Sequence, residues 1–186
     1  MSVTTVSSSM ITDATILNAD IGAAAAIATT KLGAGATVQV VNVTTGAVAT
    51  GTTTVPLDDT IPQKTEGDEF MTLAITPTHA SNKLIIEVTA FITQGTTARW
   101  VQGGLFQDDT ANALAFTLFG YPVTTATLGF FGNFSHYMAA GTTSETTFKF
   151  RAGPNAASTT TFNGQGGSRL YGGVIPSSMT ITEIKV

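Results

Sequence analysis

Large aliphatic side chains recur at intervals of five or six positions through the first 36 residues, and the residues between them are small or polar. This period matches neither a single amphipathic helix nor a half-buried strand. Three copies of the segment wound about one axis would stack the aliphatic side chains as layers of a thin core. We therefore predict a trimeric stalk over residues 1–36, with a core formed by Ile11, Ile16, Ile21, Ile27 and Leu32. A disordered tail is the alternative, but such tails are poor in aliphatic residues.

Beyond Gly33 and Gly35 the pattern changes to short runs of alternating apolar and polar residues, separated by turn residues. Runs of this kind predict the strands of a sandwich or a barrel. No helical period longer than two turns appears after residue 36. The predicted strands are Val38–Val43, Thr52–Val55, Phe70–Thr76, Leu84–Thr93, Trp100–Phe106, Leu114–Tyr121, Phe130–Met138, Thr146–Ala152, Thr159–Phe162, Leu170–Ile175 and Met179–Lys185.

Short strands without crossover helices indicate two packed antiparallel sheets. We predict an all-β fold, with a jelly-roll-like β-sandwich head over residues 37–186. Two of its strand segments, Leu84–Val88 and Gly129–Phe134, carry apolar residues on both faces. Because the outer face of an isolated sandwich should be polar, we expect a neighbouring subunit to cover part of it.

The composition narrows the classes of partner. Charged residues make up only 11% of the chain, compared with about 25% of an average soluble domain. About one residue in five is Thr, whose branched side chain suits strands. A net charge of −4 leaves no basic patch, which argues against nucleic acid as a partner. Such a composition is typical of protein coats and extracellular modules, and an ordinary small β-domain of skewed composition is the alternative.

The chain contains no cysteine, which excludes disulfides, thiolate zinc sites and cysteine nucleophiles. Its first ten residues have neither the basic nor the apolar stretch of a signal peptide. No apolar run approaches the ~20 residues of a membrane span. We therefore expect synthesis in the host cytoplasm without a signal peptide, and no insertion into a membrane.

Sequence motifs for catalysis are absent: there is no nucleophile elbow, zinc-protease motif, phosphate loop or dinucleotide fingerprint. His79 falls in a predicted turn and His136 inside a predicted strand, where hydrogen-bonded or packed histidines are ordinary. Asp108 and Asp109 are adjacent in a turn, which does not suit a separated acid and base. We predict no enzyme, no cofactor and no metal. The acidic connection 58–69 leaves calcium open, although its spacing is not that of an EF-hand.

Aromatic residues are concentrated in the second half of the chain, and most of them must fill the core. Trp100 and Tyr121 lie at the ends of predicted strands. An exposed ring in such a place can stack on a sugar or anchor a protein partner. These two residues are therefore the candidate contacts with a ligand or partner.

Several segments, in their order along the chain, resemble bacteriophage virion fibre proteins. The segment ITDATILNADI from Ile11 and the segment AAAIATTKL ending at Leu32 are similar to a short stalk motif. The segments similar to a β-domain of fibre tips are GAVATGTTTVPLDDTIPQ from Gly46, TEG from Thr65, MAAGTTS from Met138, TFKFRAG from Thr147 and SMTITEIK from Ser178. The resemblance implies a homotrimer with a stalk and a jelly-roll-like head, somewhat like tumour necrosis factor-type trimers. It implies no catalysis and assigns no receptor-binding residues.

The pattern and the resemblance together predict a structural protein on the surface of a bacteriophage virion. The expected form is a trimeric tail or head fibre or spike, attached to another virion protein through residues 1–36, with its head facing host polysaccharide or protein. A capsid decoration or cement protein that stabilises the shell is the alternative, which the short segment ahead of the head keeps open. A small enzyme acting on host polysaccharide is a third possibility, disfavoured by the missing catalytic residues.

Overall fold

The computed structural model describes residues 31–95, 98–120 and 129–186. The chain divides into two units, Met1–Leu32 and Gly33–Val186. The second unit is called the β-sandwich below. Four members of the predicted stalk core, Ile11, Ile16, Ile21 and Ile27, lie outside the described residues, as does Tyr121. Leu32, the fifth member, is half-buried.

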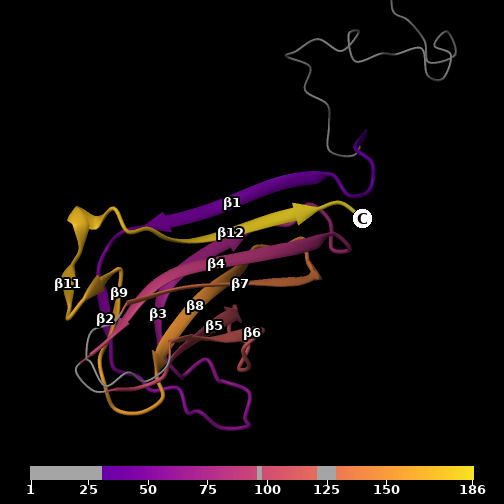
Figure 1. Cartoon of the computed structure of the whole chain (residues 1–186). Coiled ribbons are helices and arrows are strands. Elements are labelled where there is room, and N and C mark those ends of the chain that lie inside the picture. The colour runs from indigo at the N-terminus through magenta and orange to yellow at the C-terminus, as the bar shows by residue number, and fades with distance from the viewer. Residues whose placement is uncertain (1–30, 96–97, 121–128) are drawn as a thin grey trace, which may run out of the picture. The chain divides into compact units, whose positions relative to one another are not determined.

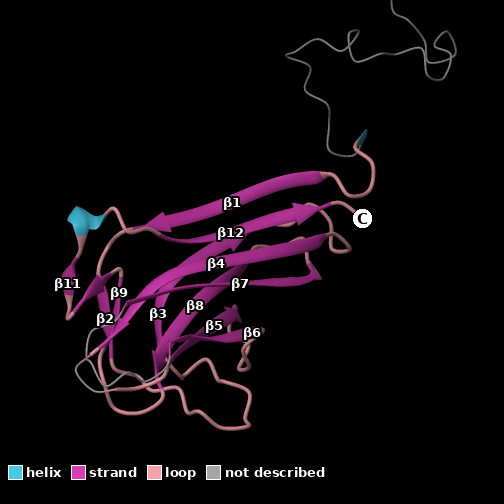
Figure 2. Ribbon diagram, in the orientation of Figure 1, coloured by secondary structure: helices cyan, strands magenta, loops and turns pink. Residues whose placement is uncertain are grey.

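The β-sandwich consists of two sheets in which every strand pairing is antiparallel (Figures 1 and 2). The first sheet contains, in spatial order, β1 (Thr37–Thr45), β12 (Ser177–Ile184), β4 (Lys83–Gln94) and β7 (Gly129–Ala139). Two short strands extend this sheet: β9 (Thr160–Phe162) pairs with the last residues of β4, and β2 (Ala49–Gly51) pairs with β9. The second sheet has the order β3 (Asp68–Ile75), β8 (Thr146–Pro154), β5 (Val101–Gln107) and β6 (Ala115–Gly120). A small hairpin, β10 (Gly164–Gln165) and β11 (Ser168–Arg169), precedes a 3₁₀ turn, η4 (Tyr171–Gly173).

The order of the eight long strands is that of a jelly roll. The chain passes from β1 to β3, back to β4, and on to β5, so that successive strands change sheets. It then runs through β6, returns to β7 in the first sheet, and crosses to β8 before ending on β12. Two four-stranded sheets connected in this way form two Greek keys. The predicted all-β jelly-roll fold is therefore confirmed.

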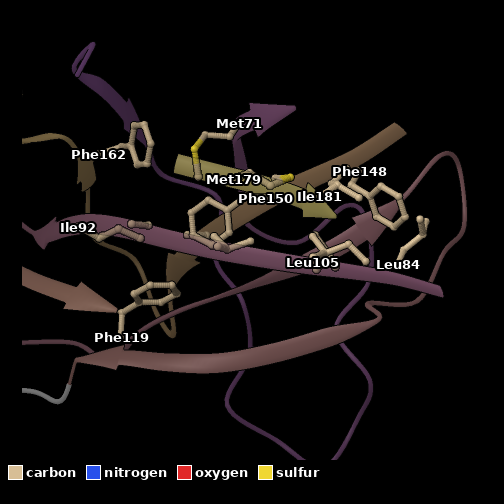
Figure 3. Packing of buried hydrophobic residues seen from close by; sticks show 14 of the residues in the cluster. Met71, Leu84, Ile92, Leu105, Phe119, Phe148, Phe150, Phe162, Met179 and Ile181 are labelled. Atoms are coloured by element: carbon tan, nitrogen blue, oxygen red, sulfur yellow. The ribbon is translucent and has the colours of Figure 1, made fainter. Parts of the chain in front are cut away.

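Aromatic rings fill the space between the two sheets (Figure 3). Phe150 of β8 is fully buried, and its ring centroid lies 5.6 Å from that of Phe119, 6.3 Å from that of Phe134 and 6.5 Å from that of Phe162. Phe134 and Phe162 belong to the first sheet, so Phe150 joins both layers. Alternate residues of β4, from Leu84 to Ile92, complete this core.

Along one edge of β4 the neighbouring strand changes from β12 to β9, and a polar network provides hydrogen-bond partners for the backbone groups at this change. Residues Lys83–Thr89 of β4 pair with β12, and Ile92–Gln94 pair with β9. Phe91 lies between these two segments. Its N–H donates to Ser177 Oγ (2.9 Å), and its carbonyl accepts from the N–H of Asn163 (3.0 Å). The Ser177 hydroxyl in turn donates to Asn163 Oδ1 (2.6 Å), so no buried backbone group of Phe91 lacks a partner.

The connection between β2 and β3 covers the outer face of the second sheet at β5. Val55 of that connection is buried, and its N–H donates to the carbonyl of Pro154 (2.9 Å). The carbonyl of Val55 accepts from Nε2 of Gln102 (2.6 Å) on β5. As a result, every residue of β5 from Val101 to Phe106 is buried.

Two predicted strands are wrong. Residues 52–55 do not continue β2, because the N–H and hydroxyl of Thr53 both donate to the carboxylate of Asp68 instead of a neighbouring strand. Residues 170–175 contain η4, because Tyr171, Gly172 and Gly173 have φ angles of 43°, 66° and 90°. Left-handed backbone of this kind is incompatible with an extended strand.

The last strand departs from simple hydrophobic patterning. Met179 and Ile181 are buried on its inner face. Glu183 takes the third buried position, and Ile184 points to the other side. A hydrogen-bonded carboxylate occupies a position that hydrophobic patterning reserves for an apolar residue.

No helix in the described part of the chain is long and apolar enough to span a membrane.

Replacing Phe150 tests the aromatic core. Phe150→Ala removes a ring that touches both sheets and should lower the free energy of unfolding by about 3–5 kcal/mol. Phe150→Leu refills most of the volume and should cost clearly less. Urea denaturation of the full chain at one fixed protein concentration measures both losses. Equal losses for the two variants would contradict the central role of the ring.

Candidate functional site

The β-sandwich has two ends of different character. β1 starts and β12 finishes at the same end, and the connections β3–β4, β5–β6 and β7–β8 lie there too. This end, called the tether end, is where residues 31–36 join the fold. The opposite end, called the loop end, carries the connections that leave β1, β4 and β8 (Figure 1). Residues 33–36, which lead into β1, therefore lie at the opposite end of the β-sandwich from the loop end.

Backbone hydrogen bonds hold residues 35–36 against the end of the chain. The N–H of Gly35 donates to the carbonyl of Lys185 (2.8 Å), and the N–H of Lys185 donates to the carbonyl of Ala36 (2.9 Å). The β1–β12 pairing is thereby extended to the residues just ahead of β1.

Glu183 is the centre of the tether end. This residue is 0% exposed, and its carboxylate accepts hydrogen bonds from residues in two other segments. Gln39 Nε2 (2.6 Å) approaches from β1, and Asn82 Nδ2 (2.6 Å) approaches from the β3–β4 connection. The N–H and hydroxyl of Thr78, in the same connection, each donate at 2.9 Å. One carboxylate therefore fixes β1, β12 and the β3–β4 connection together.

Opposing effects set the pKa of Glu183. Burial raises it, while the hydrogen bonds from Asn82, Gln39 and Thr78 lower it, and together they leave the pKa below the ordinary value of 4.5. The carboxylate is thus charged at neutral pH, and its charge is held by donors rather than by a cation.

A shallow cavity of about 350 Å³ lies at the loop end. Hydroxyl side chains and glycine backbone line it: Thr50, Gly95, Ser158, Thr159, Thr161, Gly166 and Gly167. Such groups can donate and accept hydrogen bonds, as a polar, uncharged ligand requires. None of these residues was a candidate in the sequence, because hydroxyls and glycines are common throughout the chain.

Residues 163–173, two of which line this cavity, contain an exposed tyrosine and a backbone with several positive φ angles. Tyr171 is 79% exposed and Val174 is 77% exposed. Six residues have positive φ here, Asn163, Gly166, Gly167, Tyr171, Gly172 and Gly173, out of ten in the described residues. At Gly46 there is no room for a Cβ, which would lie 1.9 Å from the carbonyl oxygen of Gly173. The segment is therefore packed closely on the β1–β2 connection, and it presents Tyr171 to solvent.

Sequence reasoning missed Tyr171 as a candidate contact because the residue was placed in a strand. The signal that could have found it is the pair of glycines that follows, since consecutive glycines favour a turn with left-handed backbone. Non-glycine residues in such backbone are uncommon and cluster at functional sites.

Trp100, one of the two predicted contacts, also lies at the loop end. It is half-buried directly ahead of β5, and its backbone is fixed by Asn155. The N–H of Trp100 donates to Asn155 Oδ1 (2.9 Å), and its carbonyl accepts from the N–H of Asn155 (3.0 Å). The structure thus brings Trp100 and Tyr171 to the same end of the fold.

One of the two histidines and two carboxylates of the acidic connection have hydrogen-bond partners within the fold. His79 Nδ1 lies 2.8 Å from the Ser81 hydroxyl, and burial among the strands lowers the pKa of His136. In the acidic connection, Asp58 accepts from Thr60 and Glu66 accepts from the N–H of Gln63 (3.0 Å). In the described ranges, no three His, Asp or Glu side chains are grouped so that they could hold a metal ion.

Comparison with known proteins gave structural likenesses only. No protein-family model and no curated protein matches the chain. Solved structures of infectious bursal disease virus, Gx strain and Gt strain, are each 9% identical to the chain with a TM-score of 0.36. The similarity to the Gx strain covers 80% of this chain and 40% of that protein. The similarity to the Gt strain covers 81% of this chain and 38% of that protein. The VP2 subviral particle of that virus is 10% identical over 81% of this chain and 38% of its own, with a TM-score of 0.35. The chain thus spans less than half the length of these proteins, and likenesses this distant carry no argument about function.

Replacing Glu183 tests the tether end. Glu183→Gln keeps the size but removes the charge and turns an NH₂ group toward several donors, so stability at pH 7 should fall by about 1–3 kcal/mol. Because the native pKa lies below the unfolded value, the carboxylate stabilises the fold above pH ~4.5, and this stability is lost as the pH falls through the native pKa. Urea denaturation between pH 7 and pH 3 should show a weaker acid dependence in the variant.

The matched control is Glu145→Gln, at an exposed glutamate in the β7–β8 connection at the same end of the fold. It should leave both stability and its pH dependence close to those of the unchanged protein. An unaltered acid dependence in Glu183→Gln would show that another group is responsible.

Proposed function

We propose that the chain is a non-enzymatic structural protein of a virus particle, a trimeric bacteriophage surface fibre or spike. Its N-terminal segment attaches to another virion protein, and its β-sandwich faces outward and binds the host surface, either polysaccharide or protein. The observation that carries the proposal is the polarity of the jelly roll: the N-terminal segment joins one end, and the candidate contacts lie at the other.

Rigid fixation of the tether end supports attachment through the N-terminal segment. A force or torque applied at residues 31–36 passes directly into β1 and β12. Both strands are tied to the β3–β4 connection by the buried carboxylate of Glu183. A protein that anchors a domain on a particle needs such a stiff junction, whereas a monomeric binding module does not.

Features of the loop end support recognition of an uncharged or weakly charged surface. The exposed ring of Tyr171 can stack on a sugar or pack against a protein. The hydroxyl-lined cavity supplies hydrogen-bonding groups without charge. Tyr171 lies in the segment with constrained backbone, which also supplies Gly166 and Gly167 to the lining of the cavity, so this part of the site loses little conformational entropy on binding.

A capsid decoration protein remains the second candidate. The outer face of the first sheet, unlike that of the second, is covered by no described residue and could lie against a shell. The two candidates differ in what the loop end does: a fibre binds host cells through it, and a decoration protein does not.

Binding of the labelled full chain to host cells separates these candidates. The full chain should be a trimer by light scattering and should bind host cells. Tyr171→Ala should weaken binding at least tenfold, as expected for truncation of a central aromatic contact. Leu57→Ala, at an apolar residue of the β2–β3 connection that is 52% exposed, is the control and should bind normally.

A full chain that does not bind host cells, together with particles that become fragile but adsorb normally when the protein is deleted, would establish the decoration protein instead. A full chain that is monomeric in solution would contradict the proposal of a trimeric fibre.

A further inference from the structure

The outer face of the first sheet, called the open face, consists of the side chains of β1, β12, β4 and β7 that alternate with buried ones. The core-facing residues of β4 and β12 are buried, whereas their outward neighbours are half-buried or exposed. The β2–β3 connection covers the second sheet at β5, but no described segment covers the open face. This face is therefore the broad surface of the jelly roll that is available to a partner.

Apolar side chains form two rows across the open face. In the first row Val40 pairs with Thr182, Thr182 with Ile85, and Ile85 with Tyr137, so the row crosses all four strands. Val40 is 55% exposed and Tyr137 is 62% exposed. Large exposed side chains thus lie at the two margins of this row, with Thr182 and Ile85 between them.

The second row contains Phe91 of β4 and its partner Phe131 of β7, whose ring centroids are 5.0 Å apart. Phe131 remains 58% exposed. Between the two rows lies a hollow of about 260 Å³ that is lined by Glu87, Thr89, Asn133 and Ser135, with Val88 and Phe134 beneath. Exposed aromatic side chains beside a hollow on one face are typical of a protein interface.

Electrostatics favour a second copy of the chain as the occupant. The open face carries only two charged side chains, Lys83 and Glu87, which have opposite sign. They are four residues apart on β4, which separates them by roughly 13 Å. Two such faces can therefore pair Lys83 of one copy with Glu87 of another, without net repulsion. A nucleic acid or an anionic membrane would require an excess of positive charge instead.

The open face is large enough to contribute to an interface, but not to supply all of it. Four strands about 4.8 Å apart and about eight residues long, at roughly 3.3 Å per residue, give a face of about 500 Å². Three such faces turned toward a common axis would bury about 1,500 Å² in total, or about 500 Å² for each pair of copies, which is below the ~1,200 Å² of a standard pairwise interface. Contacts through residues 1–32 must then supply the rest of the buried area.

We infer that the open face is the surface through which copies of this chain associate. The inference rests on the proposed trimer and adds where its subunits touch: the β-sandwiches contact one another through β1, β12, β4 and β7, and not only through residues 1–32.

The first test places a charge on the open face. Tyr137→Lys and Phe131→Lys alter exposed side chains, so each variant should keep the circular dichroism spectrum and melting behaviour of a folded sandwich. Light scattering of the full chain over a concentration series should show at least a tenfold rise in the dissociation constant. Leu118→Lys, at an exposed position of β6 in the second sheet (50% exposed), is the control and should keep the mass of the unchanged protein.

A charge swap gives the second test. Lys83→Glu and Glu87→Lys should each weaken association, and the double variant should restore it. Within one copy these side chains are too far apart to interact strongly in water, so restoration reports contact between copies.

Three results would overturn the inference, and each has a different consequence for the proposed function. If both charged aromatic variants are folded and trimeric, the subunits associate through residues 1–32 alone and the proposed fibre stands. If the variants are trimeric but fail to join particles, the open face lies against the shell. If the unchanged protein is a monomer, the proposed trimer fails together with this interface.

Discussion

Packing of aromatic rings between the two sheets is the constraint on which the rest of this structure depends. Phe150 of the second sheet lies among rings from both layers, and Phe70 stacks on Phe162 at 5.1 Å. Rings this large set the spacing of the sheets, and aliphatic side chains occupy most of the remaining inward positions between them. The few polar groups that are also buried must then be satisfied individually, which explains the concentrated networks around Asn163 and Glu183.

Those two networks give the fold its direction. Asn163 and Ser177 supply the hydrogen bonds at the position where the neighbour of β4 changes from β12 to β9, and this position marks the beginning of the loop end. Glu183 closes the opposite end, where the N-terminal segment joins β1. A jelly roll fixed in this way holds its two ends at a constant distance, which suits a domain that is attached at one end and makes contacts at the other.

The two sheets differ in how their outer faces are treated. The β2–β3 connection supplies Val55 and buries β5 on both sides, whereas β4 and β7 keep Ile85, Phe131 and Tyr137 at the outer surface. Apolar residues on both faces of a strand therefore have two explanations in one molecule. One is cover by the chain itself, and the other, which we infer for the first sheet, is cover by another copy.

The sequence by itself determined the fold class and most of the strands, because alternation of side chains and turn residues are local properties that survive without any contact. Low charge and missing catalytic motifs led to the prediction of a structural rather than an enzymatic protein, which stays a prediction. Only the tertiary structure decided which strands share a sheet, that Glu183 is buried in place of Ile184, and that Tyr171 is exposed on left-handed backbone. Each of these depends on partners far away in the chain: Glu183 on Gln39, Thr78 and Asn82, and the segment of Tyr171 on Gly46. Local periodicity carries no information about such distant partners, and hydrogen bonds from them can reverse the burial preference of a charged side chain.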